Sequence, residues 1–324
     1  MKKLIITIAT LAMTTTLANA RDNVQVTGSS TVLPYATIVA ESFGENFGFD
    51  TPVVEGGGSG AGRKKLCEGV GEQTVDIANS SSKITEKDIA LCTSNGVGDI
   101  MEVEFGFDGI VFATTVNGPS FALTEKDLYL ALHKDSTFTK WNEVNADLPD
   151  QEISVLIPGT KHGTREVFDV KVMEAGCKEV LAVEKLDDDQ KKACHAVRTD
   201  GVAIDIDGDY TETLSRLDAN PNAMGVFGLS FYQNNTNKLQ VATIDSVVPS
   251  VETISTGEYP VSRPLYFYVK LAHIGVIPGL QEYVDYFVSD DMAGPDGALA
   301  SYGLVPHPDL ASVQAHVAAL TPLE

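Results

Sequence analysis

The stretch Val24-Gln-Val-Thr-Gly-Ser-Ser-Thr-Val-Leu-Pro34 decides the fold class. Residues 24–26 are predicted to form a short strand and residues 27–31 a Gly/Ser/Thr turn, and Pro34 begins a helix whose apolar positions follow at helical spacing. A strand that passes through a polar turn directly into a helix is the first half of a βαβ unit. The stretch therefore predicts an α/β fold.

The same order of strand, polar turn and helix occurs twice more along the chain. Residues 52–55 are predicted as a strand, residues 56–62 as a glycine-rich turn and residues 63–70 as a helix. Farther along, a strand is expected at 153–157, and after a second polar turn a helix is expected at 164–176. This alternation favours parallel or mixed sheets that are covered by helices.

The three turns share one chemistry. The first turn of a helix has unpaired backbone N–H groups and partial positive charge, glycine lets the backbone approach a ligand, and hydroxyls donate without formal charge. A fourth polar loop, Asn79-Ser-Ser-Ser82, follows a predicted strand at 75–78. Each loop alone is also explained by ordinary helix capping. Because ligands collect at the carboxyl ends of strands in open α/β sheets, the four loops together predict an anion site.

The N-terminus has the pattern of a secretory signal peptide. Met1-Lys-Lys3 precedes an apolar run at 4–13, and Ala18-Asn-Ala20 supplies the small residues of a cleavage site after Ala20. The alternative is a retained membrane anchor, although the apolar run is too short to span a bilayer. We therefore expect residues 1–20 to be removed from an exported, periplasmic protein without membrane insertion.

Composition restricts the partners and the size of the fold. The chain has 45 Asp and Glu residues and 23 Lys and Arg residues, for a net charge of -22. Nucleic acid is excluded as a partner by this charge, and an anion must be held by local dipoles and hydrogen bonds. The roughly 300 residues after the signal peptide are long for one core and sufficient for two lobes.

The four cysteines follow the predicted signal peptide, at positions 67, 92, 177 and 194. An even number in an exported protein favours disulfides, for which three connectivities exist. The short separations favour pairing Cys67 with Cys92 and Cys177 with Cys194, and four reduced, buried cysteines are the alternative. No CxxC or CxxH spacing supports a structural zinc site.

These segments together resemble the periplasmic phosphate-binding proteins that feed ABC-type phosphate importers. The resemblance covers most of the chain after the signal peptide and rests on a set of short motifs: Thr27-Gly-Ser-Ser-Thr31, Gly56-Gly-Gly-Ser-Gly60, Val75-Asp-Ile-Ala-Asn-Ser-Ser81, Phe107-Asp-Gly-Ile-Val111, Gly163-Thr-Arg165, Gly225-Val-Phe-Gly228 and Tyr259-Pro-Val-Ser-Arg-Pro-Leu-Tyr266. It implies an α/β, two-lobed Venus-flytrap fold with a mixed sheet in each lobe. Lobe one is expected at 21–113 plus 255–324 and lobe two at 114–254.

The resemblance also implies capture of inorganic phosphate in the cleft between the lobes and delivery to the permease subunits of an ABC importer. Residue by residue, it places the phosphate ligands at Ser30, Thr31, Ser59, Ser81, Gly163 and Thr164, with Arg165 and His162 as further candidates. His162 is otherwise an exposed loop histidine. We expect a monomer, which is the default for a protein that diffuses to a permease.

This chain departs from some well-known members of the family at three positions. They resemble it elsewhere but have an aspartate where Ser81 stands, a serine where His162 stands and an arginine where Pro158 stands. We hypothesise that Arg165 supplies the missing cation, with a solvated first-turn arginine as the alternative. Ser81 discriminates less strongly against sulfate than a carboxylate does. Asp108 is either a substitute acceptor or a hinge aspartate.

Other functions fit the sequence less well. Gly57-Gly-Ser-Gly-Ala61 departs from the nucleophile elbow of a hydrolase and does not continue as a phosphate-binding P-loop, and the histidines lack paired metal-ligand spacing. Asp205-Ile-Asp-Gly-Asp209 lacks the remainder of an EF-hand loop. We therefore expect no enzymatic activity and no cofactor. Binding of another oxyanion, such as sulfate or a phosphonate, and surface adhesion are the alternative functions.

Overall fold

The computed structural model describes residues 21–160, 163–208 and 210–323. The predicted signal peptide 1–20, with its cleavage site after Ala20, and the candidate ligand His162 lie outside the described residues.

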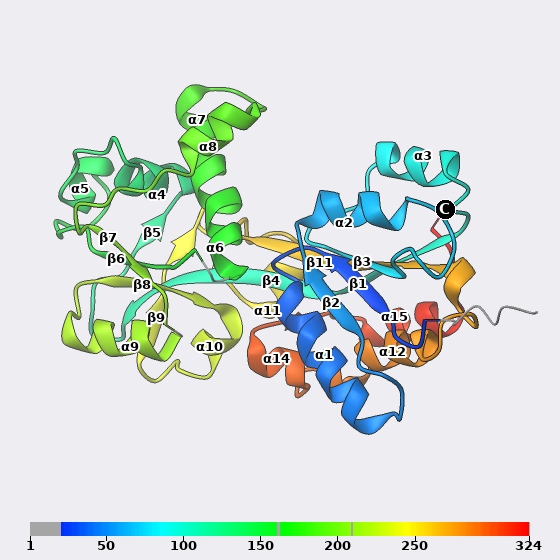
Figure 1. Ribbon diagram of the computed structural model, residues 1–324. Coiled ribbons are helices and arrows are strands. Elements are labelled where there is room, and N and C mark those ends of the chain that lie inside the picture. The colour runs from blue at the N-terminus through cyan, green and yellow to red at the C-terminus, as the bar shows by residue number, and fades with distance from the viewer. Residues whose placement is uncertain (1–20, 161–162, 209, 324) are drawn as a thin grey trace, which may run out of the picture.

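One long strand joins the two lobes. β4 (Ile100–Thr115) pairs with β11 (Ser262–Lys270) from Ile100 to Gly109 and with β8 (Met224–Gly228) from Ile110 onward, both times antiparallel. Figure 1 shows one lobe at each end of β4, which confirms the two-lobed α/β fold. The division of the chain at 113/114 and 254/255 stays a prediction, whereas the sheet partners of β4 change between Gly109 and Ile110.

The main sheet has the order β2-β1-β3-β11-β4-β8-β6-β7. Strands β1, β2 and β3 pair in parallel in lobe one, and β6, β7 and β8 pair in parallel in lobe two, so each lobe has a mixed sheet. The remaining bounds are β1 (Gln25–Gly28), β2 (Val53–Gly56), β3 (Ile77–Ser80), β6 (Val155–Pro158), β7 (Ala203–Ile206), β9 (Leu239–Val241), β12 (Val305–Pro306), β5 (Ala122–Leu123) and β10 (Thr243–Ile244).

Helices cover both faces of the sheet in lobe one. Figure 1 shows α2 and α3 on one face and α1, α12 and α15 on the other. The helices of lobe one are α1 (Leu33–Asn46), α2 (Ser59–Leu66), α3 (Glu86–Ser94), η2 (Leu271–His273), α12 (Leu280–Phe287), α13 (Asp290–Ala293), α14 (Ala298–Tyr302) and α15 (Leu310–Ala318).

Lobe two carries a larger set of short helices around its own core. They are α4 (Glu125–Leu132), α5 (Trp141–Val144), α6 (Gly163–Val167), η1 (Phe168–Glu174), α7 (Ala175–Leu181), α8 (Asp188–Cys194), α9 (Tyr210–Ala219), α10 (Leu229–Gln233) and α11 (Val251–Ser255). Trp141 is fully buried in this core, where its ring centroid lies 5.3 Å from that of Phe121. Trp141 is therefore a packing residue of lobe two.

The prediction of a glycine-rich turn through residue 62 is wrong, because α2 already begins at Ser59. The reason is packing: a Cβ atom added at Gly62 would lie 2.5 Å from the Cα atom of Gly28 at the end of β1. The helix needs glycine at this point to approach the strand closely, although glycine is a poor helix former. Helix α2 also ends earlier than predicted, at Leu66.

The predicted end of the second-lobe helix at Gly176 is also wrong, because α7 continues to Leu181. A Cβ atom at Gly176 would lie 2.3 Å from the backbone oxygen of Glu125 in α4. Gly176 therefore allows two helices to pack closely, and it does not end either of them.

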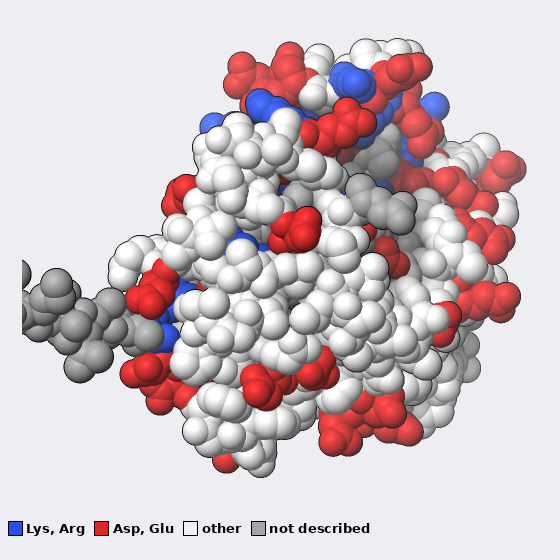
Figure 2. All heavy atoms as spheres, turned by 90° about the vertical axis from the view of Figure 1, so that its right-hand side faces the viewer, with Lys and Arg blue, Asp and Glu red and all other residues white. Residues whose placement is uncertain are grey.

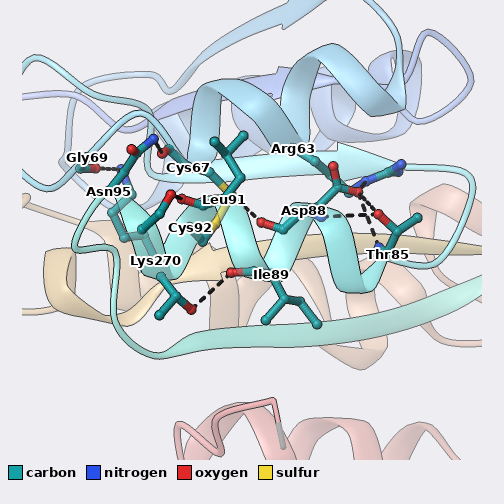
Figure 3. The surroundings of a disulfide bond; sticks show 12 residues. Arg63, Cys67, Gly69, Thr85, Asp88, Ile89, Leu91, Cys92, Asn95 and Lys270 are labelled. Atoms are coloured by element: carbon teal, nitrogen blue, oxygen red, sulfur yellow. Dashed lines mark hydrogen bonds and ion pairs between the residues drawn. A yellow bond between two sulfur atoms is a disulfide. The ribbon is translucent and has the colours of Figure 1, made fainter.

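Both favoured disulfides are present in the structure. Cys67 at the end of α2 is bonded to Cys92 in α3, and Cys177 in α7 is bonded to Cys194 in α8. Figure 3 shows that the first disulfide lies beside the ion pair of Arg63 and Asp88, whose Nε and Oδ2 atoms are 2.8 Å apart. Two cross-links, one covalent and one ionic, therefore fix α2 against α3.

Lobe two contains a buried acidic side chain, that of Glu125. Glu125 is only 6% exposed, and its Oε2 atom has no hydrogen-bond partner among the described residues. Burial and the neighbouring carboxyl group of Asp245 raise the pKa of Glu125 to about 7. Folding therefore favours the protonated form of this side chain.

We expect the double variant Cys67→Ser/Cys92→Ser to lose about 3 kcal/mol in free energy of unfolding, since the disulfide closes a loop of 25 residues. Urea denaturation of the oxidised variant and wild type measures the difference. The matched control is Cys177→Ser/Cys194→Ser, which leaves lobe one cross-linked. Equal stability of wild type and Cys67→Ser/Cys92→Ser would contradict the prediction.

The raised pKa of Glu125 predicts a loss of stability with increasing pH. Its contribution is fully present below the unfolded-state pKa of 4.5 and is lost as pH rises through the folded-state pKa of about 7. Glu125→Gln should therefore flatten the fall in free energy of unfolding between about pH 5 and about pH 8. Urea denaturation across this range checks it, and parallel pH profiles for variant and wild type would show that Glu125 does not titrate as described.

Candidate functional site

The first polar loop places a buried threonine, Thr31, just before α1. The hydroxyl oxygen of Ser29 accepts hydrogen bonds from the backbone N–H groups of Thr31 at 3.2 Å and Val32 at 3.4 Å, which shapes the turn. Thr31 is 2% exposed, whereas Ser30 lies at the surface. Of the two predicted ligands in this loop, Thr31 is therefore the one that faces the interior.

Arg263 lies against Thr31, although no role was predicted for this arginine from the sequence. Arg263, near the start of β11, donates from Nη2 to the Oγ1 atom of Thr31 at 2.6 Å. Its side chain is buried, and its Nε atom has no hydrogen-bond partner in the described part of the chain. The motif around Arg263 is visible in the sequence, but its side chain lies near the first loop only in the folded sheet, in which β11 pairs with β3 and β3 pairs with β1.

A carboxylate from lobe two reaches the same two groups. Glu166 in α6 accepts a hydrogen bond from the Thr31 hydroxyl, and its Oε2 atom lies 3.4 Å from Nη2 of Arg263. Glu166 is therefore an oxyanion held between a hydroxyl and a guanidinium. The contact also joins α6 of lobe two to the first loop of lobe one.

A second carboxylate lies behind the guanidinium. Asp108 in β4 is 3% exposed, and its Oδ2 atom lies 3.9 Å from Nη2 of Arg263. Burial raises the pKa of Asp108, with Glu166 acting in the same direction and Arg263 in the opposite one. Asp108 is thus a buried acceptor next to the cation, at the position where β4 passes from one lobe to the other.

Ser59 and Ser81 are brought together as the sequence predicted for loops at one sheet edge. Their hydroxyl oxygens lie 3.2 Å apart, and the backbone N–H of Ser81 donates to the Ser59 hydroxyl at 3.1 Å. Arg63 shapes this loop by donating to the hydroxyls of Ser80 at 2.7 Å and Ser82 at 3.1 Å. Arg63, which is paired with Asp88, therefore holds the residues on both sides of Ser81.

The second-lobe loop ends at the start of α6. Gly163 and Thr164 begin this helix, and the Thr164 side chain lies beside the hydroxyl of Tyr210. The Oγ1 atom of Thr164 is shielded from solvent. Both residues are thus placed where the first turn of a helix offers donors.

The guanidinium of Arg165 is bonded to three groups of lobe two. Its Nε atom donates to Asp169 at 2.8 Å, and its Nη1 atom donates to Asp205 at 2.6 Å and to the carbonyl of Pro158 at 3.1 Å. These bonds engage the guanidinium with groups of lobe two. A ligand role for Arg165 stays a prediction, and Arg263 is the arginine that lies next to the first loop.

The surface is acidic on the side of lobe one that faces away from lobe two. On the face shown in Figure 2, Asp and Glu side chains predominate over Lys and Arg. Within the described ranges, no group of three or more His, Cys, Asp or Glu side chains is arranged to hold a metal ion. No helix in the part of the chain that the structure describes is long and apolar enough to cross a membrane.

The chain is similar in sequence to one family of known proteins. A family model described as a PBP superfamily domain matches residues 14–291. Protein SphX of Synechocystis sp. is 29% identical to this chain over 91% of the chain and 81% of its own length. Phosphate-binding protein PstS of Staphylococcus haemolyticus is 26% identical over 81% of this chain and 75% of its own length.

Solved structures have the same fold. A structure described as a "possible phosphate binding protein" from Planctomyces limnophilus matches with a TM-score of 0.72 and 26% identity, over 92% of this chain and 98% of that protein. PstS from Borrelia burgdorferi matches with a TM-score of 0.59 and 20% identity, over 84% of this chain and 95% of its own length. The similarity spans both lobes in each case.

Proposed function

Because the chain belongs to the PBP superfamily, whose domain matches residues 14–291, we propose that it binds inorganic phosphate between its lobes and delivers it to the permease of an ABC importer. A relative is described as a phosphate-binding protein, and a structural neighbour is described as a "possible phosphate binding protein". Their similarity to this chain extends over most of its length, so the proposal concerns the whole two-lobed protein.

The observation that supports the proposal most directly is that Thr31 and Arg263 together contact a carboxylate, that of Glu166. The carboxylate of Glu166 accepts a hydrogen bond from the Thr31 hydroxyl, and its Oε2 atom lies 3.4 Å from Nη2 of Arg263. Donors that hold a carboxylate in this way also suit a phosphate oxygen, and a guanidinium strengthens such hydrogen bonds. The buried Nε atom of Arg263, which has no partner among the described groups, offers a further donor.

The remaining donors come from the loops that the sequence singled out. We infer that Ser59 and Ser81 donate from one side of the ligand and that the Thr164 hydroxyl and the N–H groups at the start of α6 donate from the other. Ser30 and Arg165 are weaker candidates, since Ser30 faces the surface and Arg165 is paired with Asp169 and Asp205. His162 remains a predicted ligand.

Selectivity for phosphate over sulfate requires a group that accepts a hydrogen bond from the protonated oxyanion. Ser81 stands where other members have an aspartate, and a hydroxyl can donate to sulfate as readily as it accepts from phosphate. Asp108 is the buried carboxylate nearest to Arg263 that we propose for this role. Facing sulfate, an ionised Asp108 would repel the ligand and lose its hydrogen bond.

The rest of the proposal concerns where the protein works and with what. We propose that the chain is exported after cleavage behind Ala20, binds phosphate in the periplasm as a monomer without converting it, and docks on the permease with its lobes closed. Its negative net charge agrees with an anion site built from local hydrogen bonds and one buried guanidinium.

Calorimetric titration of the protein, stripped of bound anions, tests the proposal. Wild type should bind one phosphate, and Arg263→Gln should weaken binding about 100-fold because a charge-assisted hydrogen bond is lost. Thr31→Val, which keeps the shape of the side chain, and Thr164→Ala should each weaken binding about tenfold. The matched control is Arg216→Gln, which removes an arginine at the surface of α9 and should leave the affinity unchanged.

Three outcomes would contradict the account. Absence of phosphate heat together with absence of thermal stabilisation by phosphate would reject phosphate as the ligand. Equal affinity for sulfate and phosphate would reject Asp108 as the selecting group. Unchanged phosphate affinity in a folded Arg263→Gln variant would show that a different residue supplies the cation of the site. Arg165→Gln would then be the next variant to titrate.

A further inference from the structure

Glu166 is a side chain of lobe two that brings negative charge to the first loop of lobe one. Its carboxylate contacts Thr31 and Arg263, the two groups of lobe one that are proposed to bind phosphate. These partners are 2% and 6% exposed, whereas the side chain of Glu166 is 44% exposed. The buried donors are thus fixed, and the carboxylate has open space into which it can move.

We propose that Glu166 is an internal competitor of the oxyanion, which occupies the donors of Thr31 and Arg263 when the cleft is empty and thereby latches lobe two to lobe one. The proposal rests on the phosphate site described above and concerns how its affinity is set. Phosphate must displace the carboxylate before it can bind both donors.

The charges around Arg263 favour displacement of Glu166 by phosphate over binding of both anions to Arg263 at the same time. Asp108 already faces the guanidinium of Arg263, so with Glu166 two carboxylates surround one cation. A phosphate bound beside both would place three anionic groups around Arg263, and like charges at such distances repel strongly in a buried site. Movement of Glu166 into solvent removes one of them, whereas Asp108 is fixed within β4.

The latch has a defined effect on affinity. A ligand that binds only the unlatched protein has an apparent dissociation constant equal to its intrinsic constant divided by the unlatched fraction. If the latch is closed in about nine molecules of ten, apparent phosphate binding is about tenfold weaker than the site allows. The latched protein also differs from the usual ligand-free state of a hinged protein, because its lobes are held together without ligand.

The opposite role for Glu166 would be that of a positioning residue, which stays on Arg263 in the phosphate complex and holds the guanidinium in place. The two roles predict opposite effects of Glu166→Gln. Loss of a competitor strengthens phosphate binding, whereas loss of a positioning residue weakens it. The same variant changes the lobe arrangement without ligand only if the carboxylate acts as a latch.

The test combines small-angle X-ray scattering of the anion-free protein with calorimetric phosphate titration. Glu166→Gln keeps the size of the side chain and removes its charge, and Glu184→Gln is the matched control, since residue 184 lies exposed in lobe two. We expect a larger radius of gyration for anion-free Glu166→Gln than for wild type and Glu184→Gln. We also expect about tenfold tighter phosphate binding by Glu166→Gln.

An unchanged radius of gyration in Glu166→Gln would overturn the latch, and phosphate affinity equal to or weaker than wild type would overturn the competitor. The scattering measurement contains no phosphate. If wild type binds no phosphate at all, the proposed function fails, and scattering alone still decides whether Glu166 holds the lobes together.

Discussion

The buried guanidinium of Arg263 is the group on which the arrangement of the site depends. A charge removed from water is costly unless carboxylates or hydrogen bonds compensate it, and this one has Asp108 on β4, Thr31 on the first loop and Glu166 on α6 around it. Each comes from a different part of the chain. Groups from the hinge strand β4, from lobe one and from lobe two therefore meet at the guanidinium of Arg263, whose charge they compensate.

Other parts of lobe one hold the proposed ligands Ser59 and Ser81. The disulfide of Cys67 and Cys92 and the ion pair of Arg63 and Asp88 join α2 to α3, and the same Arg63 shapes the loop that carries Ser81. A site that is preorganised in this way loses little conformational entropy on binding. With buried donors on lobe one and an exposed carboxylate on lobe two, the proposed ligand exchange requires displacement of the Glu166 side chain.

Sequence patterns predicted the fold class, both disulfides and the four loops, because these depend on local signals such as strand periodicity, turn residues and cysteine spacing. They misplaced the start of α2 and the end of α7, since Gly62 and Gly176 serve contacts with segments distant in sequence. They also favoured Arg165 as the cation. Arg263 lies beside Thr31 only because β11 pairs with β3 and β3 pairs with β1, while Arg165 is paired with Asp169 and Asp205. Long-range pairing of this kind leaves no local signature.

The most direct test of the account is a crystal structure of the protein grown with arsenate, a tetrahedral oxyanion whose arsenic atom is located by anomalous scattering. The account predicts one strong arsenic peak in the cleft, with oxyanion oxygens in hydrogen-bond contact with Thr31 and Arg263 and with Glu166 turned away from both. An arsenic peak on Arg165, or a cleft without one in which Glu166 keeps its contacts, would contradict it.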